Sequence, residues 1–152
     1  MIHLRLCALV LGIVGIASLT GCGGGEATTP LEVKVVSSKV KLEDTDSIEV
    51  VFTPESSEGK PATANGSVRD QPLKAKRADL PGVVPGKYKL SVKISPYSGM
   101  GQERAPVLAQ LNNTLTTETS GLVYEVTSEP NQSITIDLDA KTVTKNASAA
   151  TP

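Results

Sequence analysis

The thiol of Cys22 is the side chain whose neighbours predict the most specific covalent reaction in this sequence. It follows Leu19-Thr20-Gly21, where small residues would let a protease close on an extended backbone while the thiol meets a lipid donor at a membrane surface. The preceding sequence starts with one positive charge at Arg5 and continues as an uncharged apolar run over residues 6–19. A positive start, an apolar run and a small-residue exit are typical of a secretory signal peptide.

The apolar run argues against a permanent transmembrane helix. A bilayer core is about 30 Å thick and a helix rises about 1.5 Å per residue, so residues 6–19 are too few to cross it. The motif Leu19-Thr20-Gly21-Cys22 resembles the lipobox of bacterial lipoproteins. The resemblance implies that residues 1–21 are a cleaved signal peptide and that Cys22 becomes the lipid-modified first residue. The alternative is an ordinary secretory signal followed by a chance cysteine.

Lipid modification at Cys22 would determine where the protein works. Each buried CH₂ contributes about 0.8 kcal/mol, so several acyl chains hold a protein in a membrane where one chain is marginal. We therefore expect a protein anchored to the cell membrane or the outer membrane, with its domain facing the periplasm or the cell exterior. The expected partners are the membrane, through the anchor, and an envelope protein, and the protein itself is expected to be a monomer.

The positions of His and Cys exclude several chemistries from the processed chain. His3 is the only histidine, and Cys7 is the only other cysteine; both lie in the segment expected to be removed. Residues 22–152 therefore cannot form a Ser-His-Asp triad, a Cys-His dyad, a His-based metal site or a disulfide. No pair of carboxylates stands at a spacing recognisable for acid–base catalysis. We expect no enzymatic activity, no cofactor and no metal.

The balance of charge argues against nucleic-acid binding. The chain carries 15 Lys and Arg against 16 Asp and Glu, whereas nucleic-acid binding relies on a clustered positive surface. The most basic patch, Lys74-Ala75-Lys76-Arg77, is closely flanked by Asp70 and Asp79. We interpret this patch as a solvated strand or turn; the alternative is a contact with a polyanion or with lipid headgroups.

Alternation of apolar and polar residues predicts strands after a short tether. Residues 22–30 are small and polar and predict a flexible tether, and residues 141–152 predict a disordered tail. Between them, Lys87–Ile94 alternates strictly, which is typical of a strand with one buried face and one wet face. Similar alternation recurs over residues 31–35, 48–53, 122–127 and 133–138.

These strands indicate an all-β domain over residues 31–140. Turn residues such as Pro81-Gly82 and Pro85-Gly86 separate the runs, and Asn65-Gly66 predicts a tight hairpin turn. The one candidate for a helix is Ala105–Leu115. We expect a single antiparallel β-sandwich of about seven strands, or an open barrel, behind the signal peptide and the tether.

Several of these segments carry a family likeness. Ser38–Leu42, Val50–Pro54 and Gly59–Ala62 are similar to the first strands of carboxypeptidase-regulatory-like domains, which are small seven-stranded sandwiches of the prealbumin type. Val84–Val92 resembles their late strand, entered through a Pro-Gly-x-Tyr corner. Ser120–Val126 with Ile134–Leu138 resembles the closing hairpin of short planctomycete lipoproteins. The family's Asp-Gly turn is replaced here by Arg69-Asp70-Gln71-Pro72. The resemblance implies a fold and a tether and carries over no catalytic residue.

The best candidate for a binding site is the segment from Tyr97 to Arg104. It is a long glycine-bearing connection after the strongest predicted strand, and Tyr and Arg are favoured at contact hot spots. A mobile connection without a binding role is the alternative. Glu43-Asp44-Thr45-Asp46 could offer carboxylates to Ca²⁺, but it lacks the spacing of a calcium loop, which favours an acidic turn.

Two functional hypotheses remain open. The first is a non-enzymatic, lipid-anchored β-sandwich that serves as a structural or binding module of the cell envelope. The second is a protein- or carbohydrate-recognition subunit that serves an envelope enzyme or transporter. Carbohydrate sites need exposed aromatic platforms, and the chain has no Trp and only three Tyr, which favours a protein as the ligand in the second hypothesis.

Overall fold

The computed structural model describes residues 26–97 and 102–147 of the chain. In these residues, eight strands are joined by short loops, with a single α-helix and two 3₁₀ helices. Their bounds are β1 (Leu31–Val36), β2 (Ser47–Pro54), β3 (Ala62–Ser67), η1 (Val68–Asp70), β4 (Leu73–Ala75), β5 (Gly86–Ser95), η2 (Gln102–Arg104), α1 (Ala105–Asn113), β6 (Val123–Val126), β7 (Gln132–Asp137) and β8 (Thr142–Lys145).

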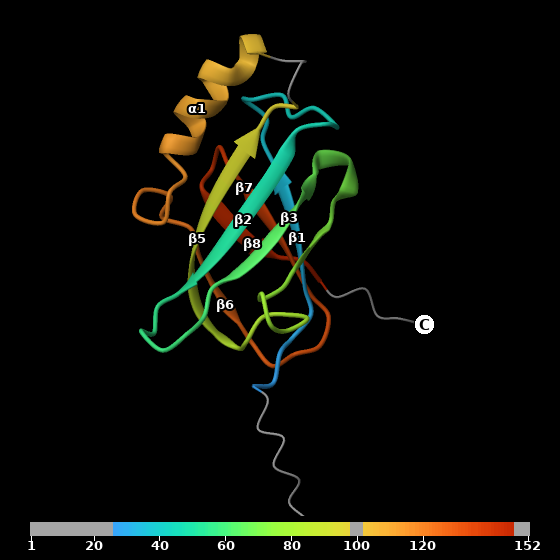
Figure 1. Ribbon diagram of the computed structural model, residues 1–152, viewed down its shortest axis with the longest axis vertical. Helices are drawn as coiled ribbons and strands as arrows, with labels where there is room; N and C mark the ends of the chain where they lie inside the picture. Colours follow the sequence, from blue (N-terminus) through green and yellow to red (C-terminus); the bar gives the residue numbers. More distant parts are fainter. Residues whose placement is uncertain (1–25, 98–101, 148–152) are drawn as a thin grey trace, which may run out of the picture.

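The strands of the described residues form two four-stranded sheets that pack as a sandwich (Figure 1). Sheet I has the order β4-β1-β7-β8, and sheet II has the order β3-β2-β5-β6. All neighbours are antiparallel except β1 and β7, which run parallel. The predicted all-β sandwich is confirmed, with eight strands in place of about seven.

The core lies between the sheets and is built from alternate residues of each strand. On β5, the side chains of Tyr88, Leu90, Val92 and Ile94 point inward, as the alternation predicts. Phe52 of β2 packs edge-on against Tyr88, with ring centroids 6.1 Å apart and an interplanar angle of 79°. A one-residue slip of β5 would place its four lysine- and serine-bearing positions in this core, so the register is strongly specified.

The last strand corrects the predicted boundary at residue 140. Thr142–Lys145, expected to be part of a disordered tail, forms β8 and pairs with β7. Only Val143 packs against the core, while Thr142, Thr144 and Lys145 are exposed. A single apolar residue gives too weak a periodic signal to reveal a strand in the sequence.

The predicted hairpin turn at Asn65-Gly66 is wrong. Both residues lie inside β3, opposite Glu49 and Ile48 of β2. A Cβ on Gly66 would lie 2.7 Å from Cδ2 of Leu73, so this glycine serves a close approach between β3 and β4. The chain instead leaves sheet II through η1 and enters sheet I at β4, which fixes the register that Arg69–Pro72 left open.

The structure also differs in two places from what the resemblance to carboxypeptidase-regulatory-like domains and planctomycete lipoproteins implies. Ser38–Leu42, likened to a first strand, lies in the irregular connection between β1 and β2. The segments likened to a closing hairpin belong to β6 and β7, which lie in different sheets and do not pair with each other. Leu31–Val36, which the likeness left without a place, is a central strand of sheet I.

Gln132 closes the crossover from β6 to β7 with its buried side chain. Its amide donates hydrogen bonds to the carbonyl oxygens of Thr127 (2.7 Å) and Glu129 (3.1 Å). Its oxygen accepts hydrogen bonds from the hydroxyl of Tyr124 (3.0 Å) and the backbone N–H of Thr127 (3.3 Å). Because a buried polar group is costly when it is unpaired, this full set of partners fixes the loop at one conformation.

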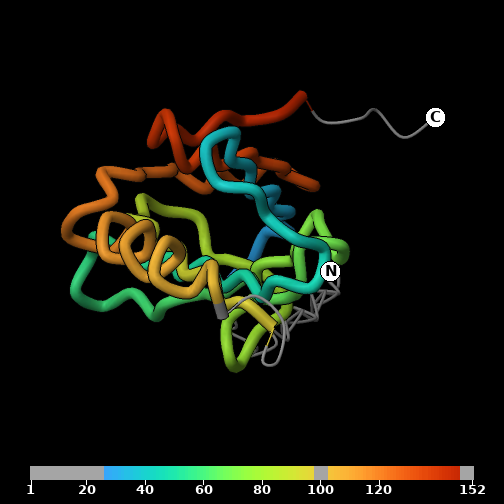
Figure 2. Tube along the Cα trace, turned by 90° about the horizontal axis from the view of Figure 1, so that it is seen from above, coloured from blue at the N-terminus to red at the C-terminus, as the bar shows by residue number. Residues whose placement is uncertain are grey.

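The outer edge of β5 is covered by side chains as well as by a strand. β6 pairs only with Gly86–Lys89. Further along, the amide of Asn112 accepts from the N–H of Ile94 (2.9 Å) and donates to its carbonyl oxygen (2.8 Å). Ser120 donates to the carbonyl oxygen of Leu90 (2.6 Å), and α1 lies beside this part of sheet II (Figure 2). A segment outside the sheet thus satisfies an edge that would otherwise be open.

Replacement of Asn112 tests this edge. We expect Asn112→Ala to lower the free energy of unfolding by about 2 kcal/mol, because two partly buried backbone groups of Ile94 lose their partners. Asn113→Ala is the matched control, since Asn113 is the next helix residue and is exposed. Urea unfolding of both variants measures the difference, and equal losses would contradict the assigned role of Asn112.

Candidate functional site

The segment predicted to bind ligands is only partly available for binding. Tyr97 at its start is 61% exposed, and residues 98–101 lie outside the described residues. Arg104 at its end forms a two-pronged ion pair with Asp46, with Nη1–Oδ1 3.1 Å and Nη2–Oδ2 2.8 Å. It also donates to the carbonyl oxygen of Lys41. The structure therefore gives Arg104 a structural role and leaves Tyr97 as the exposed member of the pair.

The acidic segment Glu43–Asp46 is a turn whose last carboxylate is buried. Asp46 is 2% exposed, and besides Arg104 its carboxylate accepts the N–H of Glu43 at 2.8 Å. The hydrogen bond to Asp46 also raises the pKa of Arg104 above its usual range. Among the described residues, no three His, Cys, Asp or Glu side chains are grouped to hold a metal ion. The carboxylate of Asp46, a candidate ligand for Ca²⁺ in the sequence, is instead paired with Arg104.

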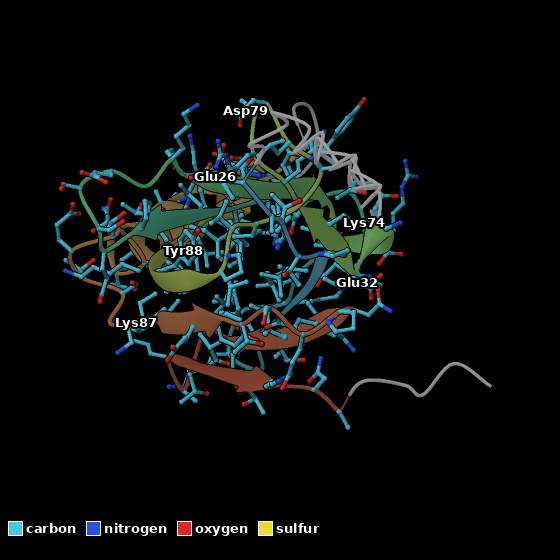
Figure 3. The ribbon with its side chains drawn as sticks, turned by 90° about the horizontal axis from the view of Figure 1, so that it is seen from below. Glu26, Glu32, Lys74, Asp79, Lys87 and Tyr88 are labelled. Carbon is cyan, nitrogen blue, oxygen red and sulfur yellow. The ribbon has the colours of Figure 1, made fainter. Side chains whose placement is uncertain are left out.

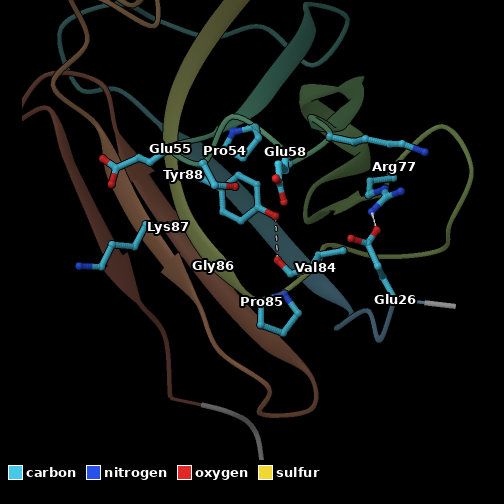
Figure 4. A pocket seen from close by; sticks show the side chains of 13 residues that line it. Glu26, Pro54, Glu55, Glu58, Arg77, Val84, Pro85, Gly86, Lys87 and Tyr88 are labelled. Atoms are coloured by element: carbon cyan, nitrogen blue, oxygen red, sulfur yellow. Dashed lines mark hydrogen bonds and ion pairs between the residues drawn. The ribbon is translucent and has the colours of Figure 1, made fainter. Parts of the chain in front are cut away.

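A cavity of about 630 Å³ opens at the end of the sandwich where the described chain begins (Figure 4). The β2–β3 turn forms one wall, the entrance to β5 forms the floor, and Glu26 with Arg77 forms the far wall. Its charged lining residues are Glu26, Glu55, Glu58, Lys60, Arg77 and Lys87. No period or motif in the sequence indicates this cavity, the Arg77 cavity, because its walls come from four separate segments.

Arg77 is the centre of an ion-pair network in this wall. Its side chain is 3% exposed, and it contacts Asp79 through Nε–Oδ1 (2.9 Å) and Nη2–Oδ2 (2.8 Å). It also pairs with Glu26, and Lys60 reaches Asp79 at 3.0 Å. The hydrogen bonds from Arg77 and Lys60 hold the pKa of Asp79 well below its usual range. The interpretation of Lys74–Arg77 as a solvated patch is therefore wrong for Arg77, although Lys74 and Lys76 are exposed.

Tyr88 fixes the floor of the cavity. Its hydroxyl donates a hydrogen bond to the carbonyl oxygen of Val84 at 2.8 Å, across the Pro85-Gly86 corner (Figure 4). Its ring packs on Phe52, and burial raises the pKa of Tyr88. This bond back to a residue upstream in the chain locks the corner through which the chain enters β5.

The segment that leads into β1 is bound to the domain. The backbones of Thr29 and Val83 exchange two hydrogen bonds, of 2.8 and 3.0 Å. The hydroxyl of Thr29 donates to the carbonyl oxygen of Thr127 at 3.1 Å. Gly82 has φ +134°, and a Cβ there would lie 2.9 Å from the carbonyl oxygen of Thr29, so the close approach requires glycine.

The predicted tether of residues 22–30 is thus wrong from residue 26 onward. Residues 22–25, including the predicted lipidation site Cys22, lie outside the described residues. Small polar residues indicate that little apolar surface is buried, but they do not exclude backbone pairing with a distant loop. The sequence therefore overestimated the length of the tether.

Asp139 holds the two loops at the opposite end of the sandwich together. It accepts hydrogen bonds from the N–H of Lys39 (3.0 Å) and the hydroxyls of Ser38 (2.9 Å) and Ser37 (3.0 Å), and from the N–H of Ser38. Partial burial raises the pKa of Asp139, but these hydrogen bonds lower it further, and the net pKa is about 2. The connection after β1 is thereby fixed to the β7–β8 turn.

That connection and α1 form a second, smaller groove. It has a volume of about 320 Å³ and lies between Lys39–Lys41 and the first turn of α1. Val40 is partly buried in it, while Val107 is 52% exposed at its rim. The segments that line this groove and those that line the Arg77 cavity lie at opposite ends of the sandwich (Figure 1).

Comparison of the chain with protein-family models, with curated proteins and with solved structures finds no match. No helix within residues 26–97 and 102–147 is long and apolar enough to cross a membrane.

The low pKa of Asp139 predicts an acid-dependent loss of stability. A carboxyl whose folded pKa is about 2, below its ordinary 3.8, contributes stability that is complete above the ordinary value and is lost as the pH falls through 2. We expect Asp139→Asn to be less stable at neutral pH and to lose less stability between pH 4 and pH 2.

Urea unfolding at a series of pH values measures this difference. Asp44→Asn is the control, because it changes an exposed carboxylate near the same end. Parallel pH profiles for wild type and Asp139→Asn would show that the hydrogen bonds to Asp139 do not stabilise the fold.

Proposed function

We propose that this protein is a lipid-anchored, non-enzymatic β-sandwich that acts as a structural or binding module of the cell envelope. The observation that carries the proposal is the motif Leu19-Thr20-Gly21-Cys22 a few residues ahead of a compact all-β domain. Such an arrangement supports a role in which the domain is held at a membrane and presents its surface to other molecules.

The use made of polar side chains supports a non-enzymatic role. Residues 22–152 contain no histidine and no cysteine other than Cys22. The buried polar side chains of the described residues are engaged in holding segments together: Asp46 with Arg104, Ser120 with β5, and Gln132 with the β6–β7 crossover. These groups stabilise the fold and are buried, whereas a catalytic group must be accessible to a substrate.

The proposal includes a relationship of fold to carboxypeptidase-regulatory-like domains. The two-sheet sandwich and the Tyr88 corner support it. The irregular course of Ser38–Leu42 and the separation of β6 from β7 into different sheets count against a strict correspondence. The likeness adds no reaction and no ligand to the proposal.

A protein partner is the second candidate, and the exposed side chains of the end that carries α1 favour it. Val107 is 52% exposed at the rim of the groove beside Lys39–Lys41, and Tyr97 is 61% exposed. A carbohydrate is less favoured, because Tyr97 is the only exposed aromatic side chain among the described residues; Phe52 and Tyr88 are buried and Tyr124 is partly buried. A protein that bound here would contact the aromatic side chain of Tyr97, the aliphatic side chain of Val107 and the groove, whose lining is both polar and apolar.

One experiment on native membranes tests the proposal. We expect the wild-type protein to partition into the detergent phase and Cys22→Ser to remain in the aqueous phase, because the thiol that carries the lipid is absent. In the same membranes, chemical cross-linking is expected to join the wild-type protein to a stoichiometric partner, and Val107→Asp is expected to weaken that product.

The matched control is Gln110→Asp, which adds the same charge at another exposed position of α1. Partitioning of Cys22→Ser into the detergent phase at the mature size would overturn the anchor. Equal cross-linking of Val107→Asp and Gln110→Asp would overturn the second candidate and leave the anchor standing. Turnover of a hydrolase substrate, abolished by one point substitution, would overturn the non-enzymatic role.

A further inference from the structure

The start of the described chain lies at the same end of the sandwich as the Arg77 cavity (Figures 1 and 3). Glu26 pairs with Arg77 in the cavity wall, and Thr29 pairs with Val83 immediately behind it. Only four steps of chain separate Cys22 from Glu26. An extended chain covers at most about 3.6 Å per residue, so these two residues are no more than about 14 Å apart.

We propose that the end of the sandwich around the Arg77 cavity is a membrane-contact surface that lies against the phospholipid headgroups. The inference rests on the proposed lipid anchor at Cys22. If Cys22 is held at the bilayer surface, Glu26 lies within about 14 Å of it, which is about twice the thickness of one headgroup region, roughly 5–8 Å. The domain is therefore held at the membrane and not at the end of a long linker.

The bound leading segment also fixes the direction of the domain. A flexible linker would allow the sandwich to turn any face toward the membrane. Here Glu26–Pro30 is held by an ion pair to Arg77, two backbone hydrogen bonds to Val83 and a hydroxyl hydrogen bond to Thr127. Thus the strands, and β5 above all, point away from the membrane. β5 has 10 residues, and at about 3.3 Å per residue it carries the opposite end roughly 33 Å further out.

The charges of the contact surface fit a headgroup that bears both signs. The cavity is lined by Glu26, Glu55 and Glu58 together with Lys60, Arg77 and Lys87. Since both signs line one opening, a phosphate can lie near Lys87 while an ammonium group lies near Glu55 or Glu58. The surface is therefore suited to zwitterionic phospholipids such as phosphatidylethanolamine and does not depend on anionic lipid, unlike a polybasic patch.

This orientation gives the two ends of the sandwich different surroundings. The Arg77 cavity faces the headgroups, while the groove between Lys39–Lys41 and α1 faces away from the membrane. A partner that bound the groove would do so without displacing lipid. The hydrogen bonds of the leading segment, Glu26–Pro30, thus determine which end of the sandwich faces the membrane and which end faces away from it.

Fluorescent probes at the two ends test the orientation. Cys22 carries the lipid and the processed chain has no other thiol, so a single introduced cysteine can be labelled. Glu58→Cys places a probe beside the Arg77 cavity and Glu43→Cys places one near the groove, both at exposed glutamates. In the lipidated protein on vesicles of phosphatidylcholine and phosphatidylethanolamine with headgroup-linked nitroxides, we expect quenching at Glu58→Cys to be several-fold greater than at Glu43→Cys.

A spacer and a change of lipid complete the design. Insertion of a twelve-residue Gly-Ser spacer between Gly25 and Glu26 keeps the anchor and is expected to remove most of the contrast between the two probes. Addition of phosphatidylglycerol is expected to leave the contrast unchanged, and a contrast that appears only with this anionic lipid would overturn the mixed-charge contact. Equal quenching of both probes on vesicle-bound protein would overturn the orientation alone. Failure of the lipidated protein to bind vesicles would overturn the anchor together with this inference.

Discussion

The constraint on which this structure depends is that backbone N–H and C=O groups removed from water must find partners. Two small sheets have four edges, and each edge exposes a row of such groups. The protein meets this requirement with contacts beyond the strand pairings: Asn112 of α1 completes the pairing of Ile94 at the edge of β5, Gln132 completes the loop at Thr127, and Thr29 pairs with Val83. Hydrophobic burial holds the sheets face to face, while these polar contacts determine how the connecting segments lie.

The same constraint separates what the sequence could predict from what it could not. Residues 31–35 and 87–94 alternate strictly, and residues 48–53 alternate except at Val51, because one face of each strand is buried, so the strands and the sandwich were predictable. The helix α1 was also found where residues 105–115 indicated it. β8 was missed because only Val143 packs inward, and Asn65-Gly66 was misread because its glycine serves a contact with Leu73 and not a turn.

The candidate sites were harder to predict for a related reason. Tyr97 and Arg104 were chosen for residue type and loop position, yet Arg104 is paired with Asp46, which lies 58 positions earlier in the chain. Arg77 appeared to be part of a basic patch, although Asp79 and the distant Glu26 take its guanidinium. Pairings of this kind carry no local signal, because each depends on which loops the fold brings together. One of these pairings, between Arg77 and Glu26, also bears on the proposed function, because it fixes the segment that leads into β1 to the end of the sandwich that carries the Arg77 cavity.

The central claim of this account is that the chain from Glu26 onward belongs to the folded domain. Native-state hydrogen exchange at the amides of Thr29 and Val83 tests it most directly, because these amides donate the two hydrogen bonds that hold the leading segment. The account predicts that both amides are protected, with opening free energies close to those of the amides in β2 and β5. Exchange of Thr29 at the rate of an unstructured chain, beside protected amides in β2 and β5, would contradict it.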